Sequence, residues 1–485
     1  MKHTRRPYSV TARLGLLALG LLLLSGCTAR PAINGRLDHY APNQGYRYES
    51  TRPGPDNSDS LLVILTFSGG GTRAAALAYG TLEALRDTTI EWEGRTRRLI
   101  DEVDAISSVS GGSLPAGYYA LFGDRIFEDF PDKVLYKDIQ GNIIKQVLAV
   151  RNYARLMSPF FSRTNLMAED FDESIFEGKT FGDLAARGNR PFLIMNATNM
   201  HQGSRFEFTQ EQFDLLYSDL SKYPVGYAAA ASAAFPGLLT PIVVRNHEEG
   251  RDYELPLWVR ETLAAGDPGR YGYQLAEEML AYVEHEQPYV HLVDGGVSDN
   301  LGLVPVILGM QGGITTAALW PAFTSGQVKK VVIITVNAKK GHEGEQELTA
   351  KIAGLFQVLD SATGTPLETF SQAQIEYLKL LIYTLRRDPQ SIWDFRGSMH
   401  GGARGAMLGP VRPVDYHFIE VAFNRHDNAE ERRYLNSLPT SFRLKTEQVD
   451  RLRAAARDIL GTHPAFQDLL EELRAEAEGK APAEE

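Results

Sequence analysis

A serine in a turn of small residues is the first candidate for chemistry. The stretch Asp104–Ser113 reads Asp-Ala-Ile-Ser-Ser-Val-Ser-Gly-Gly-Ser, and the segment Val103–Ile106, apolar apart from Asp104, predicts a short buried strand that leads into a sharp turn at Ser110. A serine hydroxyl is a weak nucleophile at neutral pH, so it needs a tight turn, a neighbouring base and donors for an oxyanion. The pattern Ser108-x-Ser110-x-Gly112 departs from the Gly-x-Ser-x-Gly elbow at Ser108 and, taken alone, is more typical of an ordinary turn. Ser110 is therefore a candidate nucleophile that needs support from other stretches.

A glycine-rich loop upstream could supply the donors. The apolar run Leu61–Phe67 predicts a strand buried on both faces, and a pattern typical of a helix begins at Ala74. Backbone N–H groups at the start of a helix favour an anion. The expected oxyanion hole is this loop, with the residues Gly69, Gly70, Gly71 and Thr72. Arg73 is expected either to position the loop or a phosphate, or to cap a turn at the surface.

Two alternatives use the same loop. The run Gly69–Ala74, with Glu91 further along, also satisfies the dinucleotide-binding pattern, although a lone glycine pattern of this kind has many false matches. Ser68 is a rival nucleophile, because it too follows a predicted strand. The three glycines after Ser68 suit backbone donors better than an elbow, so we rank it below Ser110.

A strand-end aspartate is the expected base. Asp294 ends the apolar run Val290–Val293 and is followed by Gly295-Gly296. A carboxylate accepts a serine proton only if it is partly desolvated and hydrogen-bonded to that serine. The competing interpretation is a turn aspartate, which Asp-Gly pairs often are. None of the 11 histidines lies at a glycine-rich strand end; His291, inside the same strand, keeps a Ser-His-Asp triad as an alternative.

Taken together and in order, these stretches resemble one family, the patatin-like phospholipases. They are the loop Phe67–Arg73, the elbow Ser108–Ser113 and the triplet Asp294–Gly296, with Ala231–Pro236 as a further similar segment near the site. The resemblance covers about residues 61–338. It implies a three-layer α/β/α fold with a mostly parallel central sheet. It also implies a dyad of Ser110 and Asp294, without histidine, that hydrolyses lipid acyl esters.

Two departures from the family pattern keep a second hypothesis open. Ser68 stands where the family often has aspartate, and Ser108 replaces the first elbow glycine. The alternative is a catalytically impaired scaffold that binds lipid or protein. The chain has one cysteine and no metal-binding motif, so we expect neither a metal nor a cofactor.

The amino terminus predicts export and a lipid anchor. Basic residues precede the apolar run Leu14–Leu24, which is too short to span a bilayer as a helix. The run ends in Leu24-Ser25-Gly26-Cys27, which resembles the bacterial lipobox, so Cys27 is the expected site of lipid modification. Thr28 follows where aspartate would signal retention at the inner membrane, which implies an outer-membrane location in a Gram-negative cell envelope. A plain secretory signal or an uncleaved anchor is the alternative.

The expected organisation has four parts. They are a signal peptide at 1–26, a flexible tether at 27–60, a hydrolase domain at 61–460 and a disordered acidic tail at 461–485. The domain comprises a motif core at 61–338 and an extension of helices and a strand at 339–460. A net charge of -11 without a long basic run argues against a nucleic-acid partner. The cluster Met157–Phe161 is expected to pack in the core, the alternative being an exposed patch that contacts lipid.

Overall fold

A computed structural model of the whole chain describes residues 33–248, 252–269, 272–285, 287–311, 318–324, 326–339, 355–388 and 414–479. The predicted signal peptide and Cys27 lie outside these residues. Among the described helices, none is both long and apolar enough to cross a membrane.

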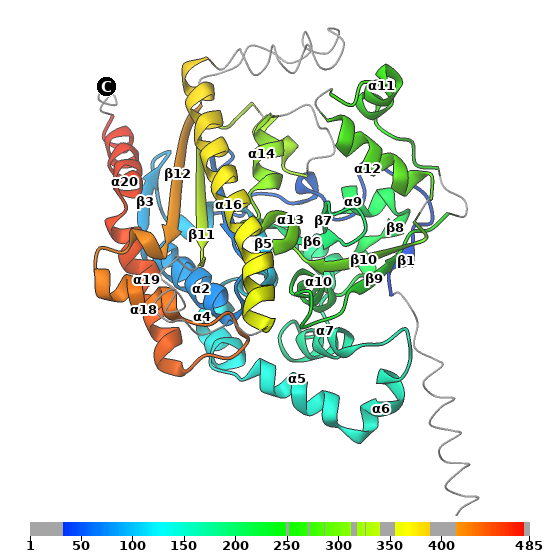
Figure 1. Cartoon of the computed structure of the whole chain (residues 1–485). Coiled ribbons are helices and arrows are strands. Elements are labelled where there is room, and N and C mark those ends of the chain that lie inside the picture. Colours follow the sequence, from blue (N-terminus) through cyan, green and yellow to red (C-terminus); the bar gives the residue numbers. More distant parts are fainter. Residues whose placement is uncertain are drawn as a thin grey trace, which may run out of the picture.

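An eight-stranded sheet forms the centre of the molecule, in the order β12-β11-β2-β5-β6-β10-β9, with β7 paired to β6 (Figure 1). Its strands are β2 (Leu61–Phe67), β5 (Val103–Val109), β6 (Phe192–Asn199), β7 (Arg205–Glu207), β9 (Ile242–Arg245), β10 (Tyr289–Asp294), β11 (Lys330–Asn337) and β12 (Asp415–Ala422). The five strands from β12 to β6 are parallel, and β10, β9 and β7 run antiparallel to their partners. Two small sheets pair β1 (Gly35–Arg36) with β8 (Ser218–Asp219) and β3 (Thr89–Trp92) with β4 (Arg95–Arg98).

Helices cover both faces of the sheet. Those of the first half of the chain are α2 (Gly71–Asp87), α3 (Ser113–Phe122), α4 (Ile126–Phe130), α5 (Ile139–Leu148), α6 (Val150–Leu156), α7 (Arg163–Ser174), α8 (Phe181–Arg187), α9 (Gln210–Leu215) and α10 (Val225–Ser232). Those of the second half are α11 (Leu257–Ala265), α12 (Tyr273–Val283), α13 (Gly296–Asp299), α14 (Val304–Gln311), α15 (Trp320–Thr324), α16 (Leu355–Arg387), α18 (Ala429–Ser437), α19 (Thr446–Thr462) and α20 (Pro464–Ala477).

The direction of each crossover along the sheet determines which face its helix covers. From β2 through β5 to β6 the chain steps one way along the sheet, which places α2 and α3 on one face, where α10 and α19 also pack. From β11 to β12 it steps the other way, so a right-handed crossover puts α16 on the opposite face, beside α13 (Figure 1). The three-layer α/β/α fold with a mostly parallel sheet is thus confirmed. The reversal between β2 and β11 is a topological switch point, where α/β proteins bind ligands at the carboxyl ends of their strands.

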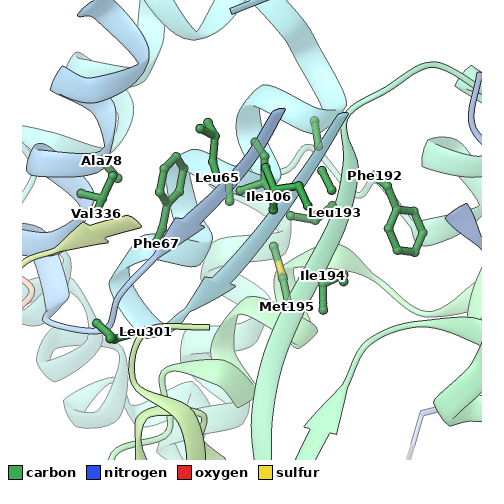
Figure 2. Close-up of a cluster of buried hydrophobic side chains, with 14 of the residues drawn as sticks. Leu65, Phe67, Ala78, Ile106, Phe192, Leu193, Ile194, Met195, Leu301 and Val336 are labelled. Carbon is green, nitrogen blue, oxygen red and sulfur yellow. The ribbon is translucent and has the colours of Figure 1, made fainter. Parts of the chain in front are cut away.

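The core is continuous along the parallel strands. Figure 2 shows Leu65 and Phe67 of β2, Ile106 of β5, and Leu193 and Met195 of β6 in one apolar cluster, all fully buried. The predicted strands at 61–67, 103–106 and 290–293 all lie within strands of this sheet, because apolar residues are what burial in the centre of a sheet requires.

Both predictions of disordered flanks are wrong for the described residues. Within the expected tether, Tyr46 is 1% exposed and its hydroxyl accepts a 2.7 Å hydrogen bond from the N–H of Leu193. Within the expected tail, α20 buries Phe466 and Leu469, and Glu472 pairs with the buried Lys330 at 2.8 Å. Both predictions rested on the largely polar composition of these segments. They fail because a few large apolar residues are enough to anchor each segment to the domain.

Candidate active site

Ser110 lies on the tight turn that follows β5. Its φ of 51° is in the left-handed region, which a residue other than glycine adopts only when its surroundings enforce it. The backbone N–H of Ser110 donates a 2.8 Å hydrogen bond to Oγ of Ser232 at the end of α10. The turn is therefore held by a neighbouring helix, and Ser110 is 6% exposed.

The Ser110 turn packs directly on the glycine-rich loop. A Cβ at Gly111 would lie 2.0 Å from the carbonyl oxygen of Gly71, so only glycine allows this approach. Gly71 itself has a φ of 61° and begins α2, a helix of 17 residues. The expected nucleophile thus sits beside the N-terminus of a long helix, where partial positive charge favours an oxyanion.

Asp294 lies at the end of β10, which pairs antiparallel with β6. In the register of β6, Val109 pairs with Asn196 and Asp294 pairs with Ala197, so neighbouring residues of β6 hold the two strand ends together. Asp294 is 5% exposed, and its carboxylate accepts a 2.8 Å hydrogen bond from the N–H of Gly296.

Burial raises the pKa of Asp294 to about 6, while hydrogen bonds from the Gly296 N–H and the Ser110 side chain oppose that rise. The predicted pair Ser110 and Asp294 thus lies at neighbouring strand ends, with the Ser110 side chain close enough to lower the pKa of Asp294. Within the described part of the chain, no histidine contributes to the pKa of Asp294, and His291 is exposed on β10.

Two of the expected oxyanion donors are already engaged. The N–H of Gly69 donates to the carbonyl oxygen of Asn300 at 3.0 Å, and that of Thr72 donates to the carbonyl oxygen of Ser441 at 2.8 Å. The prediction that Gly69 and Thr72 offer free N–H groups is therefore wrong. In the described residues no protein acceptor is found for the N–H of Gly70 or Gly71, which leaves these two as donors.

A comparison with protein families assigns about half of the chain. Residues 65–307 match the patatin-like phospholipase family. The chain belongs to this family.

The solved structures that match this patatin-like protein have low sequence identity to it. Human GIVD cytosolic phospholipase A2 is 12% identical, with a TM-score of 0.41, and the match covers 87% of this chain and 63% of that one. Its complex with methyl gamma-linolenyl fluorophosphonate is 12% identical, with a TM-score of 0.40 and coverages of 87% and 60%. VipD from Legionella pneumophila is 12% identical, with a TM-score of 0.30 and coverages of 86% and 67%. The chain thus spans less than two thirds of the human enzyme. No curated protein matches the sequence.

Arg73 of this patatin-like protein is a buried positioning residue. Its guanidinium donates to the carbonyl oxygens of Ala338 at 2.9 Å and Leu438 at 2.8 Å, and only 3% of the residue is exposed. The alternative of a surface arginine is wrong. Arg73 joins the glycine-rich loop to the end of β11 and to the segment before α19.

The rival nucleophile Ser68 has a structural role. Its Oγ accepts a 2.9 Å hydrogen bond from the N–H of Ala338, and the residue is 1% exposed. Ser68 thereby ties the loop after β2 to the strand end of β11.

Sequence reasoning missed two groups that support the site of this patatin-like protein. Ser232 accepts from Ser110 and donates to the carbonyl oxygen of Asn196 at 2.6 Å. Its segment was recognised as similar to the family, but no role was predicted for the hydroxyl. Ser441 acts through its backbone carbonyl, which no side-chain pattern could reveal.

Proposed function

We propose that the chain hydrolyses carboxylic esters of lipids through an acyl-enzyme, with Ser110 as nucleophile and Asp294 as base. The observation that carries the proposal is the buried Asp294 beside Ser110, at the ends of the two strands that flank β6. A pKa of about 6 leaves that carboxylate ionised at neutral pH and makes it a stronger base than an ordinary aspartate.

The reaction proceeds in two halves. Oγ of Ser110 attacks the ester carbonyl carbon while Asp294 takes the hydroxyl proton, and the N–H groups of Gly70 and Gly71 stabilise the oxyanion. The ester C–O bond then breaks and Asp294 returns the proton to the leaving alcohol. Water attacks the acyl-enzyme, Asp294 takes a proton from it, and collapse of the second tetrahedral intermediate releases the acid and restores Ser110.

Labelling with a fluorophosphonate probe tests the nucleophile. We expect the probe to label the wild-type chain and not Ser110→Ala, and Asp294→Asn to lose ester hydrolysis. Matched controls are Ser68→Ala, the rival serine, and Asp299→Asn, a buried carboxylate that caps the start of α14 through Val304 at 2.8 Å. Both controls should retain labelling and hydrolysis. Labelling that persists in Ser110→Ala would disprove the dyad, and an unlabelled, folded wild type would favour the impaired scaffold.

A lipid anchor at Cys27, in the envelope of a bacterial cell, completes the proposal. Its support is the lipobox-like sequence Leu24-Ser25-Gly26-Cys27. Metabolic labelling with palmitate should mark the wild type and not Cys27→Ser. Retained hydrolysis in the presence of a chelator would accord with the expectation that no metal is needed.

A further inference from the structure

Helices α5 and α6 carry exposed apolar side chains on a face that no described element covers. On α5, Ile139 and Ile143 point into the domain, whereas Ile144 and Leu148 are 52% and 65% exposed. The exposed apolar residues, here called the α5–α6 surface, are Ile144, Leu148, Val150, Tyr153, Met157 and Phe160. The expectation that Met157–Phe161 packs in the core is wrong, since Met157 is 74% and Phe160 53% exposed.

The charge of this segment is opposite to that of the chain. From Ile139 to Ala168 the sequence has no aspartate or glutamate, and its charged residues are Lys145, Arg151, Arg155 and Arg163. The whole chain has a net charge of -11. Arg155 pairs with Glu169, where acidic residues resume on α7. Within the described residues, no ion pair is found for Lys145, Arg151 or Arg163, which are exposed on α5, on α6 and at the start of α7.

The α5–α6 surface lies on the side of the molecule that holds Ser110. Figure 1 shows α5 and α6 beyond α7 and α10, past the carboxyl ends of the parallel strands. α7 packs on α10, whose Ser232 holds the Ser110 turn. At the start of α5 the N–H of Gln140 donates to Phe442, next to the Ser441 carbonyl that holds Thr72.

We propose that the α5–α6 surface binds the surface of an anionic phospholipid bilayer, with its apolar side chains among the head groups and its cations against lipid phosphates. An apolar face bordered by lysine and arginine is the chemistry of an interfacial helix. A second copy of the chain fits less well, because two identical cationic faces would repel. The binding is independent of the Ser110 chemistry and is additional to any anchor at Cys27.

A local fluorescent label tests the proposal without interference from the amino terminus. The full chain carries Cys27→Ser and Ser110→Ala, so that no other thiol and no hydrolysis remain, and an environment-sensitive dye is attached at Leu148→Cys. The matched control is Leu257→Cys on α11, which is 45% exposed and lies at the opposite end of the molecule (Figure 1). The vesicles are phosphatidylcholine alone or with phosphatidylglycerol, each with brominated acyl chains as the quencher.

We expect the dye at position 148 to be quenched by vesicles that contain phosphatidylglycerol, and the dye at position 257 to be unaffected. Lys145→Glu with Arg151→Glu, both exposed positions, should weaken the vesicle response of the 148 dye by about tenfold or more at low salt. Equal quenching at both positions, no quenching at 148, or insensitivity to charge reversal would each overturn the proposal. A response of the 148 dye to protein concentration without vesicles would identify a second copy as the occupant instead.

Discussion

The backbone N–H of Ser110 donates a 2.8 Å hydrogen bond to Oγ of Ser232, and that hydroxyl donates onward to the carbonyl oxygen of Asn196 at 2.6 Å. One buried side chain thus holds the left-handed turn of the proposed nucleophile against the middle strand of the site. The strand ends that lead to Ser110 and Asp294, those of β5 and β10, lie on either side of the same strand, β6. Ser232 therefore acts on the position of Ser110, not on the substrate.

Replacing Ser232 by alanine should lower kcat by roughly ten- to a hundredfold, because a small displacement of Ser110 spoils its approach to the ester. The lost hydrogen bonds should also lower the free energy of unfolding by about 1–2 kcal/mol. Ser218→Ala is the matched control, since Ser218 is equally buried and donates to the carbonyl of Gly35 at 2.8 Å, away from the site. The control should lose stability but keep kcat. Equal kcat in both variants would contradict a positioning role for Ser232.

The dependence of kcat/KM on pH should follow Asp294. The base must be ionised, and burial raises the pKa of Asp294 to about 6. We expect kcat/KM to reach a plateau above that pH and to fall about tenfold per pH unit below it. Hydrolysis of a soluble short-chain ester across pH 4–8 measures the profile without a vesicle surface. A midpoint near 4, the ordinary range of aspartate, would show that the catalytic base is not a buried carboxylate.

The same burial has a cost in stability. The folded-state pKa of Asp294 lies above the unfolded value, so the folded state binds the proton more tightly, and stability falls as the pH rises through about 6. At pH 7 the ionised carboxylate should destabilise the fold by up to about 3 kcal/mol. Asp294→Asn should therefore be inactive but more stable than the wild type at pH 7, and the difference should shrink towards pH 4. Denaturant melts at both pH values measure it, and a variant that is less stable at pH 7 would contradict the prediction.

The left-handed conformation of Ser110 predicts a difference between two inactive variants. Glycine adopts a φ of 51° without the steric penalty that alanine meets. Ser110→Gly should thus be more stable than Ser110→Ala by about 1 kcal/mol, as measured by chemical denaturation. The reverse order would show that the turn is not strained in solution.

The amino-acid sequence by itself determined the local units of the site. The apolar run Leu61–Phe67, followed by glycines and a helical pattern, is enough to predict strand, turn and helix, and the stretch Val103–Ser110 is enough to predict a strand that leads into a sharp turn. Asp294 can also be predicted as a candidate base from the sequence, because a carboxylate at the end of an apolar strand is unusual. Such signals are local, because the apolar pattern of a buried strand and the backbone freedom of glycine are both properties of a few consecutive residues.

Only the tertiary structure decided which groups are free to act. The carbonyls of Asn300 and Ser441 accept from the N–H groups of Gly69 and Thr72, and the buried Arg73 donates to the loop after β11 and to the segment that follows α18. A backbone carbonyl has no sequence signature, so such contacts depend on which distant segment folds over the loop. For the same reason the exposure of α5 and α6, and the packing of both flanking segments, appear only once the whole chain is assembled.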